Sequence, residues 1–286
     1  MQIIHTVEAL RDVLQTKSNI GFVPTMGNLH AGHMHLVQIA QQHASFVVVS
    51  IFVNPLQFGA HEDLANYPRT LVADCEKLEQ MDVDILFAPT VNALYPNYDG
   101  VELNQSMTVE PSPIAQILCG ASRPGHFMGV ATIVLKLFNI VQPSFAVFGQ
   151  KDFQQLFIIQ DMVRQFNLPI TIMAGETVRE SNGLAMSSRN GYLSDAEKPQ
   201  AVQLVNALQS VVTFIHQGRQ DYATLESDVQ QQLTQLGWQV DYVSIRSAHT
   251  MMPATHLDEQ LVVLGAAKLG NTRLIDNIQF CAKPLK

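Results

Sequence analysis

A short apolar run gives way to glycines and histidines in the stretch Ile20-Gly-Phe-Val-Pro-Thr-Met-Gly-Asn-Leu-His-Ala-Gly-His33. The run Ile20–Pro24 is apolar on both faces, which is typical of a parallel strand buried between layers of helices. The residues His33–His43 that follow favour a helix. We therefore predict a strand, a tight turn and a helix. In a sheet of this kind the turn lies at the carboxyl end of the strand, where ligands bind.

The same alternation continues to about residue 175. Thr6 can cap a helix that carries Val7, Leu10 and Leu14. The remaining expected strands are Phe46–Phe52, Val83–Phe87, Phe145–Phe148 and Pro169–Met173, and the remaining expected helices are Thr70–Met81 and Gly129–Val141. Strand, helix and strand at this spacing indicate right-handed crossovers, so we predict an α/β fold with a doubly wound parallel sheet, Rossmann-like, over residues 1–175.

From residue 176 the pattern changes. Two amphipathic, glutamine-rich helices are expected and then three strands: Asp195–Gln217, Tyr222–Leu236, Val240–Ile245, Leu261–Ala266 and Thr272–Ile275. Helices followed by strands favour a second, smaller α+β domain over residues 176–286. Because this domain carries a cluster of donors described below, we expect it to act as a lid.

Composition excludes several classes of protein. The 286 residues are 47% hydrophobic and 15% charged, with 17 Lys and Arg against 25 Asp and Glu, for a formal net charge of −8. An acidic chain without a basic run is a poor candidate for binding nucleic acid or anionic lipid. Apolar runs such as Phe46–Val53 are shorter than the ~20 residues that span a bilayer, and no export signal is recognisable. Cys75, Cys119 and Cys281 are scattered, which favours neither disulfides nor a zinc site. We expect a cytoplasmic protein.

The turn after the first strand is the first candidate site. Gly27 and Gly32 let the backbone approach a ligand, and the following helix presents its N–H groups and positive dipole end to an anion. His30 and His33 lie on the same side of a helical turn, where imidazoles can donate to a polyphosphate and, if protonated, offset the charge of a departing pyrophosphate. The same histidines could instead be surface residues or metal ligands, although no carboxylate accompanies them.

Further donors occur in two later segments. Ser187, Ser188 and Arg189 form a compact cluster that suits phosphate oxygens, although an exposed turn would have the same composition. Lys151 follows the strand Phe145–Phe148 and would extend a positive charge into the same crevice, and Asp152 opens the next helix. A lysine in this position can also be merely solvated.

Neutral side chains follow the second strand. Asn54 and Gln57 come just after Phe52 and can orient a small polar substrate by hydrogen bonds. Arg123 precedes the long apolar helix and could add positive charge, or could belong to an ordinary loop.

Six motifs in order carry a resemblance. The H-x-G-H and M-S-S-R segments resemble the nucleotidyltransferase superfamily that includes class I aminoacyl-tRNA synthetases. More closely, the segments PTMGNLHAGH, SIFVNPLQF, NYPRT, RPGHF, FGQKDFQQL and VRESNGLAMSSRN resemble the pantothenate synthetase (pantoate–β-alanine ligase) family over residues 24 to about 193. Each motif is weak alone, but the ordered set is specific.

This resemblance implies a two-step ligation in the coenzyme A pathway. Pantoate attacks the α-phosphorus of Mg²⁺-bound ATP to give pantoyl adenylate and pyrophosphate, and β-alanine then displaces AMP. By motif, the ATP site comprises Met26, Gly27, Asn28, Leu29, His30, Ala31, Gly32, His33, Gly149, Gln150, Lys151, Asp152, Val178, Met186, Ser187, Ser188 and Arg189, with His30, His33 and Lys151 catalytic. The substrate site for pantoate and β-alanine comprises Asn54, Gln57, Tyr67, Arg123 and Gln155, and Asp74 is implied as a contact to Mg²⁺ through water. The resemblance also implies a homodimer.

One departure separates the chain from tRNA synthetases. Their K-M-S-K-S loop reads Ala185-Met-Ser-Ser-Arg189 here, so positive charge in that loop must come from Arg189. Two alternatives to the ligase remain open at this point: a transferase that places CMP or AMP on a phosphorylated acceptor, and a nucleotide-binding regulator without activity. Gln57 and Gln155 argue against the transferase, because a phosphorylated acceptor would require basic side chains where these amides lie.

Overall fold

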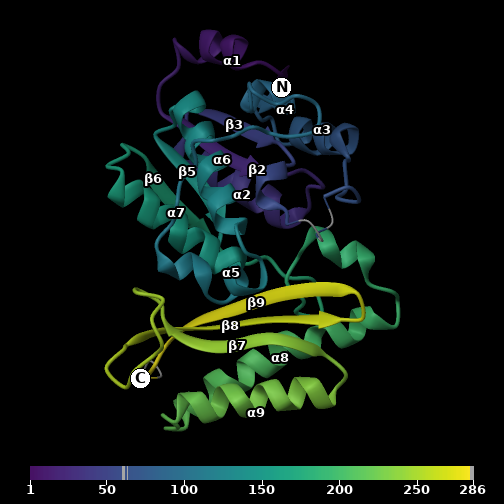
Figure 1. The fold of residues 1–286 in the computed structure, drawn as a ribbon, viewed down its shortest axis with the longest axis vertical. Coiled ribbons are helices and arrows are strands. Elements are labelled where there is room, and N and C mark those ends of the chain that lie inside the picture. The colour runs from purple at the N-terminus through teal and green to yellow at the C-terminus, as the bar shows by residue number, and fades with distance from the viewer. Residues whose placement is uncertain (60–61, 63, 284–286) are drawn as a thin grey trace. The chain divides into compact units, whose positions relative to one another are not determined.

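The computed structural model describes residues 1–59, 62 and 64–283. Contacts divide the chain into two compact units (Figure 1). The first unit consists of Met1–Gln150 with Gln155–Glu176, and the second of Lys151–Gln154 with Thr177–Lys286. Among the described residues no helix is long and apolar enough to cross a bilayer.

The first unit is built on a six-stranded sheet with the order β1-β4-β3-β2-β5-β6, and all its recorded pairings are parallel. The strands are β1 (Gln2–Ile4), β2 (Ile20–Thr25), β3 (Phe46–Ile51), β4 (Ile85–Phe87), β5 (Phe145–Gly149) and β6 (Thr171–Gly175). The five expected strands are confirmed, and the doubly wound α/β fold with them. β1 was not expected, because a run of three residues carries too little pattern to recognise.

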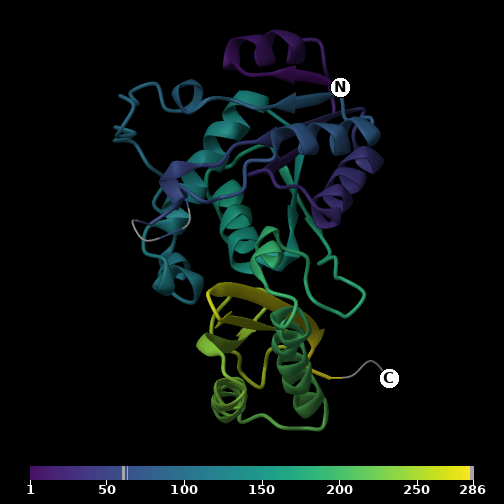
Figure 2. The same cartoon turned by 90° about the vertical axis from the view of Figure 1, so that its right-hand side faces the viewer.

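Helices cover both faces of this sheet (Figures 1 and 2). The helices in this part of the chain are α1 (Val7–Leu14), α2 (Ala31–His43), α3 (Leu71–Gln80), α4 (Val91–Leu94), α5 (Cys119–Ser122), α6 (His126–Val141) and α7 (Phe153–Gln165), with short 3₁₀ helices η1 (Pro55–Gln57), η2 (Pro113–Gln116) and η3 (Gln150–Asp152). Thr6 caps α1 as expected, since its hydroxyl accepts from the N–H of Ala9 at 3.2 Å. The apolar helix α6 begins at His126, earlier than the expected Gly129.

Alternating strand residues build two cores. Phe22 and Val48 face α1, α6 and α7, whereas Val23 and Val47 face α2 and α3. Each strand is therefore buried on both sides, which is why its sequence is apolar without a period of two.

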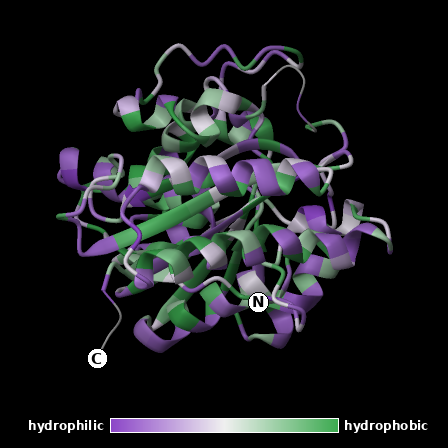
Figure 3. Ribbon diagram, turned by 90° about the horizontal axis from the view of Figure 1, so that it is seen from below, coloured by the Kyte–Doolittle hydropathy of each residue, from purple (hydrophilic) through white to green (hydrophobic). Residues whose placement is uncertain are grey.

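The second unit places two helices against an antiparallel sheet. Its elements are η4 (Ser188–Tyr192), α8 (Glu197–His216), α9 (Tyr222–Gln235), β7 (Gln239–Ser247), β8 (Gln260–Leu269) and β9 (Thr272–Cys281), with strand order β7-β8-β9. Both helices and all three strands were expected, so the α+β class of this part is confirmed. Leu204 and Leu208 of α8 and Val263 of β8 belong to one hydrophobic core. The helices carry hydrophobic and hydrophilic stripes (Figure 3).

Candidate active site

The order of the strands places the candidate site of the first unit. The chain moves outward from β2 to β3, and after β4 it returns to β5 on the other side of β2. β2 and β5 pair directly, with Gly21 opposite Phe145. The carboxyl ends of two such strands, where the winding changes direction, form the ligand crevice of an open α/β sheet. The segment 26–33 follows β2, Gly149 ends β5 and Gln150 comes next, so the fold brings these expected nucleotide contacts to one edge.

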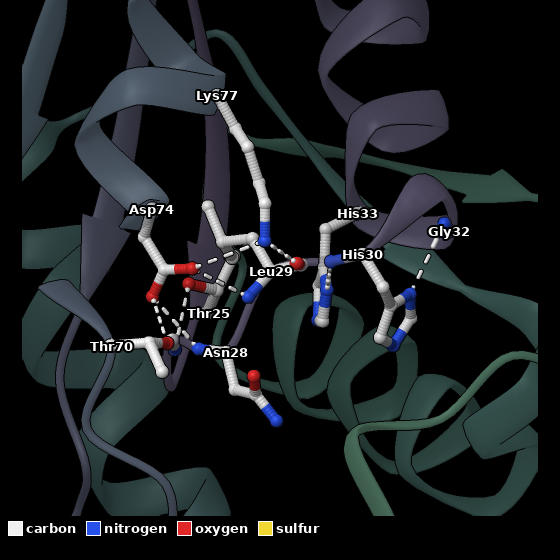
Figure 4. A network of polar contacts seen from close by, with 10 residues as sticks. Thr25, Asn28, Leu29, His30, Gly32, His33, Thr70, Asp74 and Lys77 are labelled. Carbon is white, nitrogen blue, oxygen red and sulfur yellow. Dashed lines mark hydrogen bonds and ion pairs between the residues drawn. The ribbon is translucent and has the colours of Figure 1, made fainter. Parts of the chain in front are cut away.

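The turn after β2 is held by a buried carboxylate. Asp74 has no exposed surface, and it accepts hydrogen bonds from the backbone N–H groups of Asn28 at 2.9 Å and Leu29 at 2.8 Å. The hydroxyl of Thr70 donates to the same carboxylate at 3.0 Å (Figure 4). Gly27 has φ +87°, and a Cβ there would lie 3.3 Å from an Asp74 oxygen. A glycine is therefore required at this position.

Lys77 completes this network from the next turn of α3. Its ammonium donates to the carbonyl of Leu29 at 2.6 Å and lies 3.9 Å from an Asp74 oxygen. The lysine side chain is 43% exposed, so solvent screens the ion pair, and its main effect is to hold the loop carbonyl. Asp74 and Lys77 together thus hold the backbone of the loop at Asn28 and Leu29.

The geometry of the two histidines fixes their tautomers. His30 caps α2, with its Nδ1 accepting from the N–H of Gly32 at 3.1 Å, and the Nδ1 of His33 accepts from the N–H of His30 at 3.3 Å. The rings are tilted with centroids 4.1 Å apart. An Nδ1 that accepts carries no proton, so a neutral imidazole here has its proton on Nε2. Each ring can then donate from Nε2 without being charged.

The neutral amides after β3 lie beside this loop. The Nε2 of Gln57 is 3.2 Å from the Sδ of Met26, so an expected substrate residue contacts an expected nucleotide residue. Asn54 is buried, and its Nδ2 donates to the Oε1 of Gln57 at 3.1 Å and to the carbonyl of Gly129 at 3.2 Å. Asn54 therefore orients Gln57, because both hydrogens of its amide are directed at protein oxygens.

The main chain of Gln57 is held from the other side by α6. The Nδ1 of His126 lies 2.8 Å from the Gln57 carbonyl, and the Nε2 of His126 lies 2.9 Å from the guanidinium of Arg123. Arg123 also donates to Glu62, from Nε at 2.7 Å and from a second nitrogen. The expected substrate residue Arg123 is thus part of a chain of contacts that leads to Gln57.

Other expected residues of the first unit lie as follows. Tyr67 is 5% exposed, with its ring edge-on to Phe58 at 5.6 Å between centroids. Gln155 is the third residue of α7 and is half-buried.

The second unit gathers two of the expected phosphate contacts. Lys151, Ser187, Asn190 and Asp276 line one small pocket. The carbonyl of Lys151 accepts from the side chain of Asn277 at 2.9 Å, which ties Lys151 to β9. Asp152 beside it is exposed. The fold therefore brings Lys151 next to the serine segment, although 36 residues separate Lys151 from Ser187 in the sequence.

A hairpin carries the serine segment. The N–H of Met186 donates to the carbonyl of Val178 at 2.9 Å, and Ser187 caps η4 through the N–H of Arg189 at 3.2 Å. The Nδ2 of Asn190 donates to Glu180 at 2.7 Å. These contacts close the base of the hairpin and fix the backbone from which Ser187, Ser188 and Arg189 project.

An ion pair fixes the hairpin to the sheet of the same unit. Arg179 binds Asp276 through two nitrogens, at 2.7 and 2.9 Å, and donates to the carbonyl of Gly183 at 3.1 Å. The carboxylate is 3% exposed. This bidentate geometry is the strong form of an Arg–carboxylate contact.

Several supporting residues were not found from the sequence. Tyr95 follows α4 and is fully buried, and its hydroxyl lies 2.5 Å from Asn54; burial raises the pKa of this phenol. Asp276 is 97 residues from its partner Arg179. His126 occurs in one of the family motifs, and this motif was the available signal for it.

The chain is similar to proteins of one family throughout its length. A family model described as pantoate-beta-alanine ligase matches residues 2–279. A pantothenate synthetase from Methylobacillus flagellatus is 60% identical over 280 residues, which is 98% of this chain and 99% of the relative. The crystal structure of pantothenate synthetase from Thermus thermophilus matches with a TM-score of 0.91 at 40% identity, over 99% of this chain and 100% of that one.

A second solved structure holds ligands. It is the pantoate-beta-alanine ligase from Francisella tularensis, complexed with beta-gamma ATP and beta-alanine. Its TM-score is 0.79 at 33% identity, and the match covers 99% of this chain and 98% of that one.

Proposed function

The chain belongs to the pantoate–β-alanine ligase family and is an enzyme that joins pantoate to β-alanine with ATP, and we propose that it does so through a pantoyl adenylate. In this proposal the products of the first step are the adenylate and pyrophosphate, and AMP leaves in the second.

One observation carries the proposal. The Nε2 of Gln57 lies 3.2 Å from the Sδ of Met26, in the loop that continues to His30 and His33. A neutral amide donor thus adjoins a loop of phosphate donors at the N-terminus of α2. This arrangement supports the proposal that a carboxylate is held beside the α-phosphorus of a nucleotide.

The first step follows from this arrangement. A pantoate carboxylate oxygen attacks the α-phosphorus, and the bond to the bridging oxygen of pyrophosphate breaks. Negative charge grows on the leaving pyrophosphate, where the Nε2–H groups of His30 and His33 and the ammonium of Lys151 would donate. Donors aimed at developing charge lower the barrier more than they strengthen ground-state binding.

The second step uses the adenylate as the acyl donor. The neutral amine of β-alanine attacks the acyl carbon, the bond to the phosphate oxygen breaks, AMP leaves with the negative charge, and the proton lost by the amine passes to solvent. Adenylation is needed because a carboxylate is a poor acyl donor at neutral pH. By the family resemblance, Gln57 would also lie close to the amine of β-alanine.

The remaining expected residues have proposed roles by the same resemblance. Gln155 binds pantoate with Gln57, whereas Asn54 and Arg123 act mainly through the contacts that hold Gln57. Gly149, Gln150 and Asp152 contact ribose and phosphate, and Val178 contacts adenine through its backbone. Ser187, Ser188 and Arg189 bind phosphates, so the second unit would act as a lid.

Magnesium enters this proposal with the nucleotide. Among the described residues no group of three or more His, Cys, Asp or Glu side chains could hold a metal ion. Both oxygens of Asp74 accept backbone N–H groups of the loop, so a direct bond to Mg²⁺ would cost those contacts. In this proposal the phosphates of the nucleotide would hold the ion, which would offset their charge, and Asp74 would act on it through water. We also propose a homodimer, which light scattering would detect.

Isotope exchange tests the adenylate directly. Labelled pyrophosphate should exchange into ATP when pantoate is present and β-alanine is absent. Exchange that requires β-alanine would contradict the two-step order. Exchange without pantoate would show that the carboxylate is not the nucleophile.

A further inference from the structure

A buried chain of hydrogen bonds runs from Tyr95 through Asn54 to Gln57. The hydroxyl of Tyr95 donates to the Oδ1 of Asn54 at 2.5 Å, and the Nδ2 of Asn54 donates to the Oε1 of Gln57 at 3.1 Å. All three residues are buried, with 0%, 1% and 7% of their surface exposed. In such surroundings each polar atom needs its partner.

Backbone groups fix the direction of this chain. The N–H of Leu56 donates to the Oδ1 of Asn54 at 3.4 Å, and the carbonyl of Gly129 accepts from its Nδ2 at 3.2 Å. A backbone N–H can only donate and a carbonyl can only accept, so the Asn54 amide has one allowed orientation. It follows that Tyr95 must donate to Asn54 and that Gln57 must accept with its Oε1.

The orientation of Gln57 determines what it offers a ligand. With Oε1 engaged by Asn54, the NH₂ group of Gln57 faces Met26, whose Sδ is 3.2 Å away. A thioether is a weak acceptor, so a carboxylate oxygen would be a better partner for these hydrogens. The reversed amide would present an oxygen and repel a carboxylate.

We infer that Tyr95 is a positioning residue for pantoate, which acts through Asn54 to keep the NH₂ group of Gln57 directed at the substrate. This inference rests on the proposed function, in which Gln57 binds pantoate. Neither Tyr95 nor its hydroxyl takes part in the chemistry.

The surroundings of Tyr95 suit this role. Its ring lies against Phe52, with centroids 6.2 Å apart, and the ammonium of Lys136 lies 5.1 Å from the ring centroid. Burial raises the pKa of the phenol, so its hydroxyl keeps its proton and remains a donor at neutral pH. Without this hydroxyl, the buried Oδ1 of Asn54 would keep only the contact to Leu56 at 3.4 Å, so the amide would keep its preferred orientation but hold Gln57 less firmly.

Steady-state kinetics of Tyr95→Phe test the inference, with Tyr98→Phe as the matched control. Tyr98 donates its hydroxyl to the exposed carbonyl of Gly100 at 2.8 Å, outside the chain to Gln57. We expect Tyr95→Phe to raise KM for pantoate about three- to tenfold, as for one lost hydrogen bond, with KM for ATP unchanged. Tyr98→Phe should leave all three Michaelis constants at the wild-type values.

Each outcome of these measurements supports or overturns one of the two proposals. An unchanged KM for pantoate in an active Tyr95→Phe enzyme, or an equal rise in KM for ATP, would overturn the inference and leave a structural role only. A wild-type enzyme that does not depend on pantoate would instead overturn the proposed function. If Tyr95→Phe does not fold, Asn54→Ala removes both the acceptor for Tyr95 and the donor to Gln57 and should give the same selective rise; an unchanged KM for pantoate in this variant would also overturn the inference.

Discussion

The backbone N–H of His30 donates to the Nδ1 of His33 across 3.3 Å, so the second histidine of the loop completes the cap of its own helix. The Nδ1 of His33 thus has a structural role, and the hydrogen on its Nε2 is the one proposed to be donated to phosphate. Protonation at Nδ1 would remove the acceptor and break the cap. The proposed donation to phosphate therefore uses the neutral ring.

Two substitutions of His33 separate these roles. His33→Asn keeps an acceptor near the position of Nδ1, and His33→Gln places an amide N–H near that of Nε2. We expect the Asn variant to lose about 2 to 4 kcal/mol of transition-state stabilisation, the usual cost of one donor to developing charge, and the Gln variant to lose less. Single-turnover measurement of adenylate formation gives the rates. Equal activity of the two variants would contradict donation from Nε2.

Asp74→Asn is expected to loosen the nucleotide loop. The carboxylate accepts from the N–H groups of Asn28 and Leu29 with separate oxygens, whereas an amide has only one acceptor. We expect a loss of about 1.5 to 3 kcal/mol of unfolding free energy, as for a hydrogen bond to a charged group, together with a raised KM for ATP. Urea denaturation and kinetics measure these changes. Asp12→Asn, at an exposed position of α1, is the control, and a loss of the same size there would contradict the assignment.

The sequence predicted elements and loops better than it predicted partners. The strands β2, β3 and β5 were recognisable because each is buried on both faces and therefore has an apolar sequence. The start of α1 was recognisable from its capping residue, Thr6. The support of Gln57 could not be predicted, because Asn54 and Tyr95 are 41 residues apart and become neighbours only when β3 and β4 pair. The ion pair of Arg179 with Asp276 could not be predicted either, because these residues are 97 positions apart in the sequence. The tautomers of His30 and His33 could not be predicted either, because they depend on the positions of backbone N–H groups, which a sequence pattern does not give.

The thiol of Cys75 should react slowly with iodoacetamide. Burial raises the pKa of this thiol, and the nearby carboxylates of Glu79, Asp74 and Glu76 raise it further. A raised pKa means less thiolate at a given pH, and the thiolate is the reactive form. We therefore expect the alkylation rate, followed by mass spectrometry as a function of pH, to reach half its maximum at a pH above ~8.5, the pKa of an ordinary cysteine. A midpoint at or below that value would show that the carboxylates and burial do not act on the thiol.

Ligand should slow hydrogen exchange in the serine segment of the second unit. The hairpin is closed by the hydrogen bond from Met186 to Val178 and fixed by the pair of Arg179 with Asp276, so its base is already ordered. Residues 186–190 carry the proposed phosphate donors, and contacts made only with bound nucleotide would lower the free energy of the closed arrangement alone. We expect protection of these amides with Mg-ATP and pantoate, measured by mass spectrometry. The helix α9 of the same unit, which lies on β7 and carries no proposed ligand contact, serves as the internal control.

Equal exchange of residues 186–190 with and without ligand would mean that the segment is permanently formed or does not contact the nucleotide. Protection of α9 to the same extent would indicate general stabilisation of the unit rather than closure over phosphate.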